Sequence, residues 1–431
     1  MFINENFLSF IWQYAYFDLS GLSVTDGQKI EIHSQGLLNI HSGPDFNDAS
    51  IRIGGLLWTG SIEIHVRSSH WYAHRHQEDE NYNRVILHVV WEHDRTACRS
   101  DGSEIPVLEL KHRVAPEVVF RFRKLVYGPT EKIACKPHLK FIEPVKITGM
   151  VQKALIQRLE RKSADIDRML MEYNNDWEEV SYCRLVSNFG FKVNQDNMLL
   201  LSKYIPHKLI LRHCENPVRL EALFFGMAGF LENERDEYQK RLKQEFNFLK
   251  HKYSLGGDFL KRYQWKFMRL HPQNFPTLRI SQLAMLFTRI NNIFSYVIRS
   301  DQAWKIYIDL KVDQSFYWKH NYDFGMPSKR TLSGLGKSSI SNIVINTFVP
   351  LLVAYGRFTD QSIFRERALA LLEGIAPENN RIVRYWKNAG LEVRDSADTQ
   401  GVIELYNRFC YKKQCLNCNI GTAIMLNPNL D

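Results

Sequence analysis

The spacing of hydrophobic residues changes near Lys111, and this change restricts the fold more than any other feature of the chain. Before it lie short β-branched stretches in which apolar and polar residues alternate, at 29–33, 50–53, 56–58 and 61–67. Such alternation is typical of half-buried strands, and the continuous apolar run Val85–Trp91 is typical of a fully buried one. Longer patterns with helical spacing follow. The sequence therefore predicts an α/β (α+β) N-terminal domain, a mixed sheet flanked by helices, followed by a large, mostly α-helical domain.

The predicted order of elements in the first domain is helix, three or four strands, helix and two strands. Phe7, Ile11 and Tyr14 recur at helical spacing in a first helix near 4–18. The polar residues 70–83 are predicted to form a second helix, and Pro106–Leu110 the last strand. This domain is expected to span residues 1–112.

The remainder is expected to begin with a basic helix, 115–127, and a proline-containing connector, which together span 113–146. An α-helical domain over 147–431 follows, and it ends in a group of cysteines. Its longest predicted helix spans 147–173. Shorter helices are predicted at 176–188, 196–204, 217–231, 235–251, 280–298, 338–355, 361–373, 379–388 and 398–410.

Charge is distributed unevenly along the chain. Residues 1–110 hold seven Lys and Arg against fifteen Asp and Glu, a net of −8, and the whole chain carries +9, so residues 111–431 carry +17. Eight of the 15 histidines lie between residues 33 and 93. An acidic, histidine-rich part before a basic remainder suggests metal ligands beside a surface for a polyanion.

The sequence indicates a soluble, cytoplasmic protein with no membrane partner. We find no apolar run of about 18 residues, the length that a membrane-spanning helix needs. Glu5 precedes the first apolar stretch and no basic residue does, which is unlike a secretory signal. The seven cysteines favour a reducing compartment over a disulfide framework.

The sharpest local motif pairs Gly43-Pro44-Asp45-Phe46 with Glu63-Ile64-His65. Two carboxylates at the ends of adjacent strands can hold Mg²⁺ or Mn²⁺, because these cations prefer oxygen ligands. Strand alternation places Glu63 and His65 on the same face. The generic alternative is a turn and a strand with no chemical role, since Pro-Asp and Glu-x-His are common.

This arrangement resembles the PD-(D/E)XK nuclease superfamily, in which an Asp after Pro and a Glu two positions before a Lys bind the metal that activates water. The resemblance implies a fold of helix, three-stranded meander, helix and strand, and it makes Glu5 the candidate for a Glu on the first helix. The chain departs from the pattern at His65, which stands where the Lys is expected. A neutral histidine lacks that fixed positive charge, so transition-state stabilisation is in question.

A second polar cluster follows in the predicted helix 70–83. His74 and His76, with Asp79 or Tyr82, are expected to face the metal as supporting ligands or phosphate contacts. The alternative is a solvated polar helix, with His88 as a hydrogen-bonded core residue. For the group, we favour the functional interpretation.

The C-terminal motif Cys410-x4-Cys415-x2-Cys418 suggests a zinc ion or an iron–sulfur cluster, but it is one ligand short of four. Cys135 is the predicted fourth ligand, with His138 as the Cys3His alternative. Some RecB-like members of the nuclease superfamily resemble this plan, with three C-terminal cysteines closed by a distant fourth around an iron–sulfur cluster. The other interpretation is a group of reduced cysteines without metal.

Basic residues gather in residues 111–168, which hold 14 Lys and Arg against 6 Asp and Glu. Such a surface can bind a phosphate backbone without reading sequence. The alternative is the ordinary solvated face of helices. The candidate nucleic-acid contacts are Arg121, Arg123, Lys124, Arg158, Arg161 and Lys162.

Motifs along nearly the whole chain resemble a bacterial family of uncharacterised proteins, domain of unknown function 2851. They include Trp58-x-Gly60-x-x-Glu63-x-His65, Leu87-His88-Val89-Val90, Asn274-Phe275-Pro276 and Cys415-x-x-Cys418. The resemblance implies no activity and favours treating residues 1–431 as one unit.

From the motifs we expect a metal-dependent, nuclease-like hydrolase that binds DNA or RNA. Asp45 and Glu63 would hold Mg²⁺ or Mn²⁺, His65 would take the position of the Lys, and Glu5, His74 or His76 would assist. One alternative is a non-catalytic nucleic-acid-binding or scaffold protein with a degenerate nuclease fold. Another is a zinc or iron enzyme on a small substrate, because imidazole suits those metals.

Overall fold

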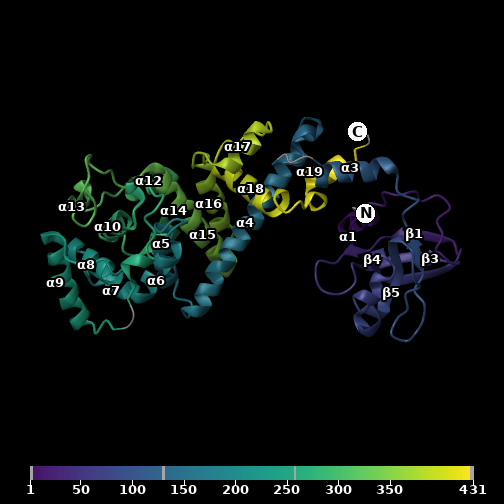
Figure 1. Ribbon diagram of the computed structural model, residues 1–431, viewed down its shortest axis with the longest axis horizontal. Helices are drawn as coiled ribbons and strands as arrows, with labels where there is room; N and C mark the ends of the chain where they lie inside the picture. Colours follow the sequence, from purple (N-terminus) through teal and green to yellow (C-terminus); the bar gives the residue numbers. More distant parts are fainter. Residues whose placement is uncertain (1–2, 129–131, 257–258, 428–431) are drawn as a thin grey trace. The chain divides into compact units, whose positions relative to one another are not determined.

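The computed structural model describes residues 3–128, 132–256 and 259–427 (Figure 1). They form two compact units. The first contains residues up to 151, with 384–391 and the C-terminal residues from 405; the second contains 152–383 and 392–404. The boundaries of these compact units differ from those of the predicted segments, which are 1–112, 113–146 and 147–431. Residues 129–131 of the predicted connector lie outside the described residues.

The first unit contains a mixed sheet with the order β1-β3-β4-β5-β6, and β2 pairs with β3. Strands β1, β3 and β4 are antiparallel neighbours, whereas β5 runs parallel to β4 and β6 parallel to β5. The expected mixed sheet near the N-terminus is therefore confirmed. The strands are β1 (Ile30–Ser34), β2 (Leu37–Leu38), β3 (Phe46–Ile53), β4 (Leu56–Arg67), β5 (Val85–Glu92) and β6 (Val107–Glu109).

Two glycine features shape the long strand β4. Gly54 and Gly55, with φ of 55° and 90°, form the two-residue turn that joins β3 to β4, because both positions need a left-handed conformation. Gly60 lies where β5 approaches: a Cβ there would come within 2.5 Å of the Arg84 carbonyl oxygen. The two predicted strands 56–58 and 61–67 are consequently one continuous strand.

Helix α1 (Glu5–Gln13) packs its apolar side chains into the core of the first unit. Asn4 caps it, since its Oδ1 accepts a hydrogen bond of 2.9 Å from the Phe7 amide. Phe7 and Ile11 are fully buried. The helix ends before the predicted residue 18, because Ala15 has a left-handed conformation with φ of 47°.

The crossover from β4 to β5 is not the single helix predicted over 70–83. It consists of α2 (His70–Ala73) and two 3₁₀ turns, η1 (His76–Glu78) and η2 (Glu80–Arg84). Arg75 has φ of 60° and stops α2 after one turn. His74 and His76 lie on either side of this break.

The rest of the first unit consists of helical segments. Helix α4 begins in this unit and continues into the second. The segments are α3 (Pro116–Tyr127), η3 (Lys136–Phe141), α4 (Pro144–Glu172), most of α17 (Arg381–Asn388), the π-turn η7 (Tyr406–Cys410), η8 (Cys415–Asn417) and α19 (Asn419–Met425).

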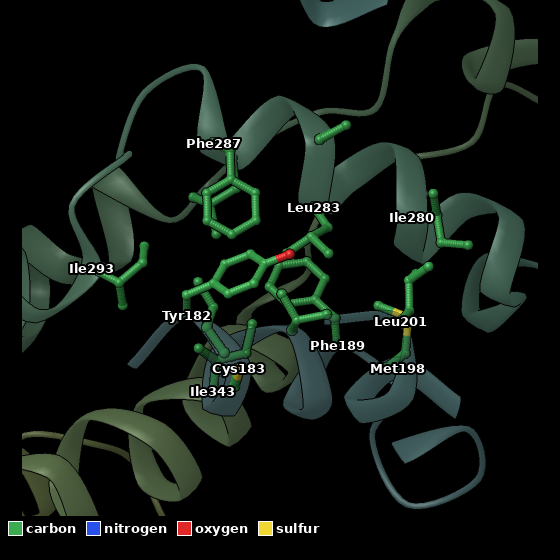
Figure 2. Close-up of a cluster of buried hydrophobic side chains, with 14 of the residues drawn as sticks. Tyr182, Cys183, Phe189, Met198, Leu201, Ile280, Leu283, Phe287, Ile293 and Ile343 are labelled. Carbon is green, nitrogen blue, oxygen red and sulfur yellow. The ribbon is translucent and has the colours of Figure 1, made fainter. Parts of the chain in front are cut away.

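The second unit is mainly helical, as expected for this part of the chain. Its core contains Tyr182 and Phe189 of α5, which face Leu283 and Phe287 of α10 (Figure 2). The buried Tyr182 hydroxyl donates to the Ile205 carbonyl at 2.7 Å. Its helices are α5 (Trp177–Phe189), α6 (Gln195–Tyr204), α7 (His207–Leu211), α8 (Pro217–Met227), α9 (Glu237–Lys252), α10 (Pro276–Phe287), α11 (Ile293–Arg299), α12 (Ala303–Asp309), α13 (Phe316–His320), α14 (Lys337–Ile343), α15 (Val349–Phe358), α16 (Ser362–Glu373) and α18 (Ser396–Leu405).

One helical stretch of the described chain, Lys337–Phe358, is long and apolar enough to cross a membrane. It joins α14, the π-turn η6 (Val344–Phe348) and α15. Within its most apolar window, 72% is buried inside the protein. Such burial is typical of a core helix, and this is the stretch that the sequence predicted as helix 338–355.

Candidate metal centre

Asp45 and Glu63 meet where β3 begins and β4 enters the buried part of the sheet. The Asp45 amide donates to Oε2 of Glu63 at 3.2 Å, and the Ile64 amide donates to Oδ2 of Asp45 at 3.0 Å. Glu63 is buried, whereas Asp45 is partly exposed. The structure thus brings together the two carboxylates that the sequence singled out.

Strand β4 directs Glu63 and His65 to the same face of the sheet, and β5 adds His88. Glu63 lies opposite His88 in the parallel register, and His65 lies opposite Val90. Glu63, His65 and His88 are all buried. The α2–η1 segment supplies His74 and His76 to the same place.

Four side chains then converge: Glu63, His65, His74 and His76, which we call the histidine site. Nε2 of His65 lies 3.1 Å from Nδ1 of His74 and 3.6 Å from Oε1 of Glu63. Nε2 of His76 lies 3.3 Å from the same Oε1. The three imidazoles offer ligand atoms that all lie within 4.8 Å of one another.

These separations fit one small cation. Ligands about 2.0–2.1 Å from a tetrahedral ion lie about 3.3 Å from each other. The buried Nε2 of His76 supports this, because its contact with Oε1 of Glu63 lacks hydrogen-bond geometry and it has no other hydrogen-bond partner in the described structure. An unpartnered buried imidazole nitrogen is costly unless a ligand satisfies it.

His88 orients His65. Its Nε2 lies 2.8 Å from Nδ1 of His65. When Nδ1 of His65 donates this hydrogen bond, the lone pair of Nε2 is free to bind a cation together with the other ligands, as is usual for histidines that bind metal. The fully buried Trp71 holds the group in place, since its ring lies 5.3 Å from that of His76 and 5.5 Å from that of His88.

Burial shapes the protonation of the site. It raises the pKa of Asp45 and of Glu63 above the usual carboxylate range, with their mutual repulsion adding to the effect at Asp45. Burial also holds the pKa of His65 far below its ordinary value, to which His88 contributes. His65 is therefore neutral near pH 7, which is the form that binds metal.

Glu5 lies at the rim and not among these ligands. Its Oε1 is 3.7 Å from Nδ1 of His70, and both side chains are partly exposed. Its charge contributes to the raised pKa of Asp45 and Glu63. Glu5 is thus close enough to act on the site electrostatically.

A groove of about 1340 Å³ borders the turn before Asp45 and the strand before Glu63. Gly43, Pro44 and Ser61 line it, together with the half-exposed Trp58. Its charged side chains are Arg84, Arg99, Asp48, Glu80, Asp101 and Glu104. The groove is therefore acidic overall.

The four predicted cysteine ligands also come together. Cys135, Cys410, Cys415 and Cys418 line one small cavity of the first unit, about 20 Å³ in volume. His138, the alternative ligand, is not among the residues that line it.

The predicted nucleic-acid contacts divide into two groups. Arg123 and Lys124 are exposed. The other four make internal contacts: Arg121 donates to the carbonyl oxygens of Met425 and Asn427, Arg158 and Arg161 bind Glu404, and Lys162 bonds to Asn346. Arg123 and Lys124 thus remain the candidates with exposed charge.

The partners of His88 and His70 were not predicted from the sequence. His88 was interpreted as either functional or a core residue, and its bond to His65 follows only from the parallel pairing of β4 with β5. His70 was not proposed at all. The pattern His-x3-His-x-His over 70–76 was a signal that could have indicated it.

A family described as Protein of unknown function (DUF2851) has a model that matches residues 5–381. The matched range includes the histidine site and Cys135, and it ends before Cys410. No curated protein and no solved structure matches the chain.

Proposed function

The chain belongs to the DUF2851 family, whose description names no activity, and from its own geometry we propose a metal-dependent nuclease that hydrolyses phosphodiester bonds in DNA or RNA. The observation that carries the proposal is the convergence of Glu63, His65 and His76 on one buried point, with Nδ1 of His74 lying 3.1 Å from Nε2 of His65. Asp45 lies beside this point through its hydrogen bond to Glu63.

The ligand set favours a transition metal over Mg²⁺. Three imidazoles and one carboxylate suit Mn²⁺, Fe²⁺ or Zn²⁺, whereas Mg²⁺ prefers oxygen ligands. Such an ion supplies an activated water and charge neutralisation on the scissile phosphate. Asp45 is suited to accept a proton, because burial raises its pKa toward neutrality and it remains partly exposed.

The order of elements supports the nuclease class. A helix, an antiparallel meander of β1, β3 and β4, a helical crossover and the parallel strand β5 follow one another. This is the order that the resemblance to PD-(D/E)XK nucleases implies. His65 replaces the expected Lys and is a metal ligand in this proposal, so the missing positive charge is supplied by the ion.

The neighbouring groove supports a polymeric substrate. Its volume of about 1340 Å³ exceeds the ~300–1,000 Å³ that is usual for small-ligand pockets. Trp58 offers an exposed ring on which a base can stack. Because the groove is acidic, we expect strand binding to require divalent cations.

The main alternative is a zinc or iron enzyme on a small substrate, which the three imidazoles favour. A non-catalytic nucleic-acid-binding protein with a degenerate nuclease fold is the other. Metal content distinguishes the non-catalytic protein from the two enzymes. The substrate that is cleaved distinguishes the nuclease from the enzyme on a small substrate.

The test combines metal analysis with cleavage assays on DNA, RNA and bis(p-nitrophenyl) phosphate as a small substrate. We expect about one Mn²⁺, Fe²⁺ or Zn²⁺ per histidine site and cleavage of a nucleic acid. His74→Ala should lose both, whereas His33→Ala, which changes an exposed histidine of β1, should keep both. Equal metal content and cleavage in the two variants would contradict the proposal.

A further inference from the structure

Four cysteines from distant parts of the chain line one cavity of the first unit, which we call the cysteine cavity. Cys135 precedes η3, Cys410 ends η7, Cys415 begins η8 and Cys418 precedes α19. Burial and the three neighbouring thiols raise the pKa of Cys410, an interaction that requires the four groups to lie near one another. The described structure contains no disulfide between them.

The backbone is shaped to bring these cysteines together. Gly421 of α19 lies against the main chain of Cys415: a Cβ at this position would come within 2.0 Å of the Cys415 carbonyl oxygen. Lys413 has a left-handed conformation with φ of 54°, which turns the chain between Cys410 and Cys415. A chance group of core cysteines requires neither feature.

Among the side chains that line the cavity, the cysteine sulfurs are the atoms suited to bind a metal. Its other lining residues are apolar or small: Leu125, Ala134, Trp386, Phe409 and Gly421. With no carboxylate or imidazole among them, a metal held here would have thiolate ligands only. Four thiolates are typical of zinc sites and of iron–sulfur clusters.

The spacing of the sulfurs separates these two possibilities. Four sulfurs about 2.3 Å from one zinc ion lie about 3.8 Å apart. In the part of the chain that the structure describes, no three cysteine sulfurs lie within 4.8 Å of one another. In a cluster of several metal ions, different cysteines bind different ions. Their sulfurs therefore lie farther apart than the ligands of a single ion.

Trp386 supplies an independent observation. It lines the cysteine cavity and is fully buried, yet its indole Nε1 has no hydrogen-bond partner among the residues that the structure describes. A buried indole N–H normally finds an acceptor. Cluster sulfide or cysteine sulfur would provide one, and such hydrogen bonds tune the reduction potential of a cluster.

We propose that Cys135, Cys410, Cys415 and Cys418 bind an iron–sulfur cluster, with the Trp386 indole directed at its sulfur. The cluster ties the segment after α3 to the C-terminal segment of the same unit. Its ligands are separate from the histidine site, so it does not depend on the proposed nuclease activity.

The test is iron and acid-labile sulfide analysis of the full chain prepared without oxygen. We expect iron and acid-labile sulfide in equal amounts, about two of each per chain for a [2Fe–2S] cluster or four of each for a [4Fe–4S] cluster. Cys410→Ser and Cys415→Ser, at two half-buried positions, should lose most of both, whereas the control variants Cys98→Ser and Cys214→Ser should retain them. His74→Ala should also retain iron and sulfide.

A measurement on the unaltered protein covers the case in which the cysteine variants do not fold. Exposure to air and chelator should remove iron and sulfide together and increase proteolysis within residues 405–427. About one zinc per chain without sulfide, or no metal in the anaerobic protein, would overturn the proposal.

Trp386→Phe tests the role of the indole. It should keep the iron and sulfide content but make the midpoint potential more negative, because a hydrogen bond to sulfur stabilises the reduced cluster. Trp177→Phe, at a position in the second unit, is the matched control. An unchanged potential in Trp386→Phe would overturn the assignment of the indole.

Discussion

Asp45 and Glu63 are joined by a hydrogen bond of 3.2 Å from the amide of Asp45 to Oε2 of Glu63. The bond leaves Oε1 of Glu63 directed at His65 and His76, at 3.6 and 3.3 Å. One carboxylate oxygen therefore holds the start of β3 in place, while the other faces the imidazoles. This division explains how a single glutamate can both position Asp45 and bind a cation.

Replacing Glu63 by Gln should weaken metal binding more than any change outside the ligand set. The amide keeps the hydrogen-bond acceptor for Asp45 but loses the charge, so the loss should exceed the ~10–100-fold typical for residues that only orient ligands. Titration of the metal-free protein with Zn²⁺ or Mn²⁺ measures it. Glu117→Gln, on the exposed face of α3, is the control and should bind as the original protein does.

Replacing His88 by Phe should lower metal affinity by roughly 10–100-fold, because His65 loses the partner that fixes its ring. His88→Gln should recover part of the affinity, since an amide oxygen can accept from Nδ1 of His65. The same metal titration checks both variants. Equal affinities for His88→Phe and the original protein would show that His88 does not orient His65.

Without metal, stability should fall as pH rises from 6.5 to 8, because Glu63 has a raised pKa of about 8 and Asp45 is raised as well. A raised carboxylate pKa means that the folded state holds more protons than the unfolded state, so the free energy of unfolding decreases with pH. The lowered pKa of His65 and His88 has the opposite effect, which is largest below their ordinary value of 6.5 and has almost vanished by pH 8.

Calorimetric Tm values of chelated protein at pH 6.5 and 8 test this expectation. Glu63→Gln should remove most of the decrease, and saturating Zn²⁺ should remove it in the original protein. A decrease of the same size in Glu63→Gln would show that other groups cause it.

Gly60→Ala should destabilise the sheet by roughly 1–3 kcal/mol, since the added methyl group meets backbone and cannot be accommodated without moving β5. Gly149→Ala is the control. It lies in α4 with open space around its Cα, so we expect a gain of about 0.5–1 kcal/mol. Thermal unfolding of both variants measures the difference, and equal effects would contradict the close approach of β4 and β5.

The sequence predicted more of the sheet than of the crossover. Strands were predicted from the alternating residues of β1 and β4 and from the apolar run of β5, and the structure has a strand at each place. Burial of a strand on one or both faces fixes the spacing of its apolar residues, which can be read from the sequence. The left-handed conformation of Arg75 left no such pattern, so residues 70–83 were predicted as one helix. The separate predicted helix 280–298 is likewise divided into α10 and α11.

The site was predictable in its members but not in its arrangement. Asp45, Glu63, His74 and His76 were identified by residue type and spacing. The turn at Arg75 brings Nδ1 of His74 within 3.1 Å of Nε2 of His65, and the position of α1 keeps Glu5 at the rim. Pairwise spacing in the sequence specifies neither arrangement.

Cleavage by the original protein and by Glu63→Gln, each with and without Mn²⁺, tests the central claim most directly. Labelled single- and double-stranded DNA and RNA serve as substrates, and circular dichroism confirms that the variant is folded. The proposed site predicts cleavage of at least one substrate that requires Mn²⁺ and is lost in Glu63→Gln. Cleavage that survives in Glu63→Gln, or the absence of any cleavage by the metal-loaded original protein, would contradict it.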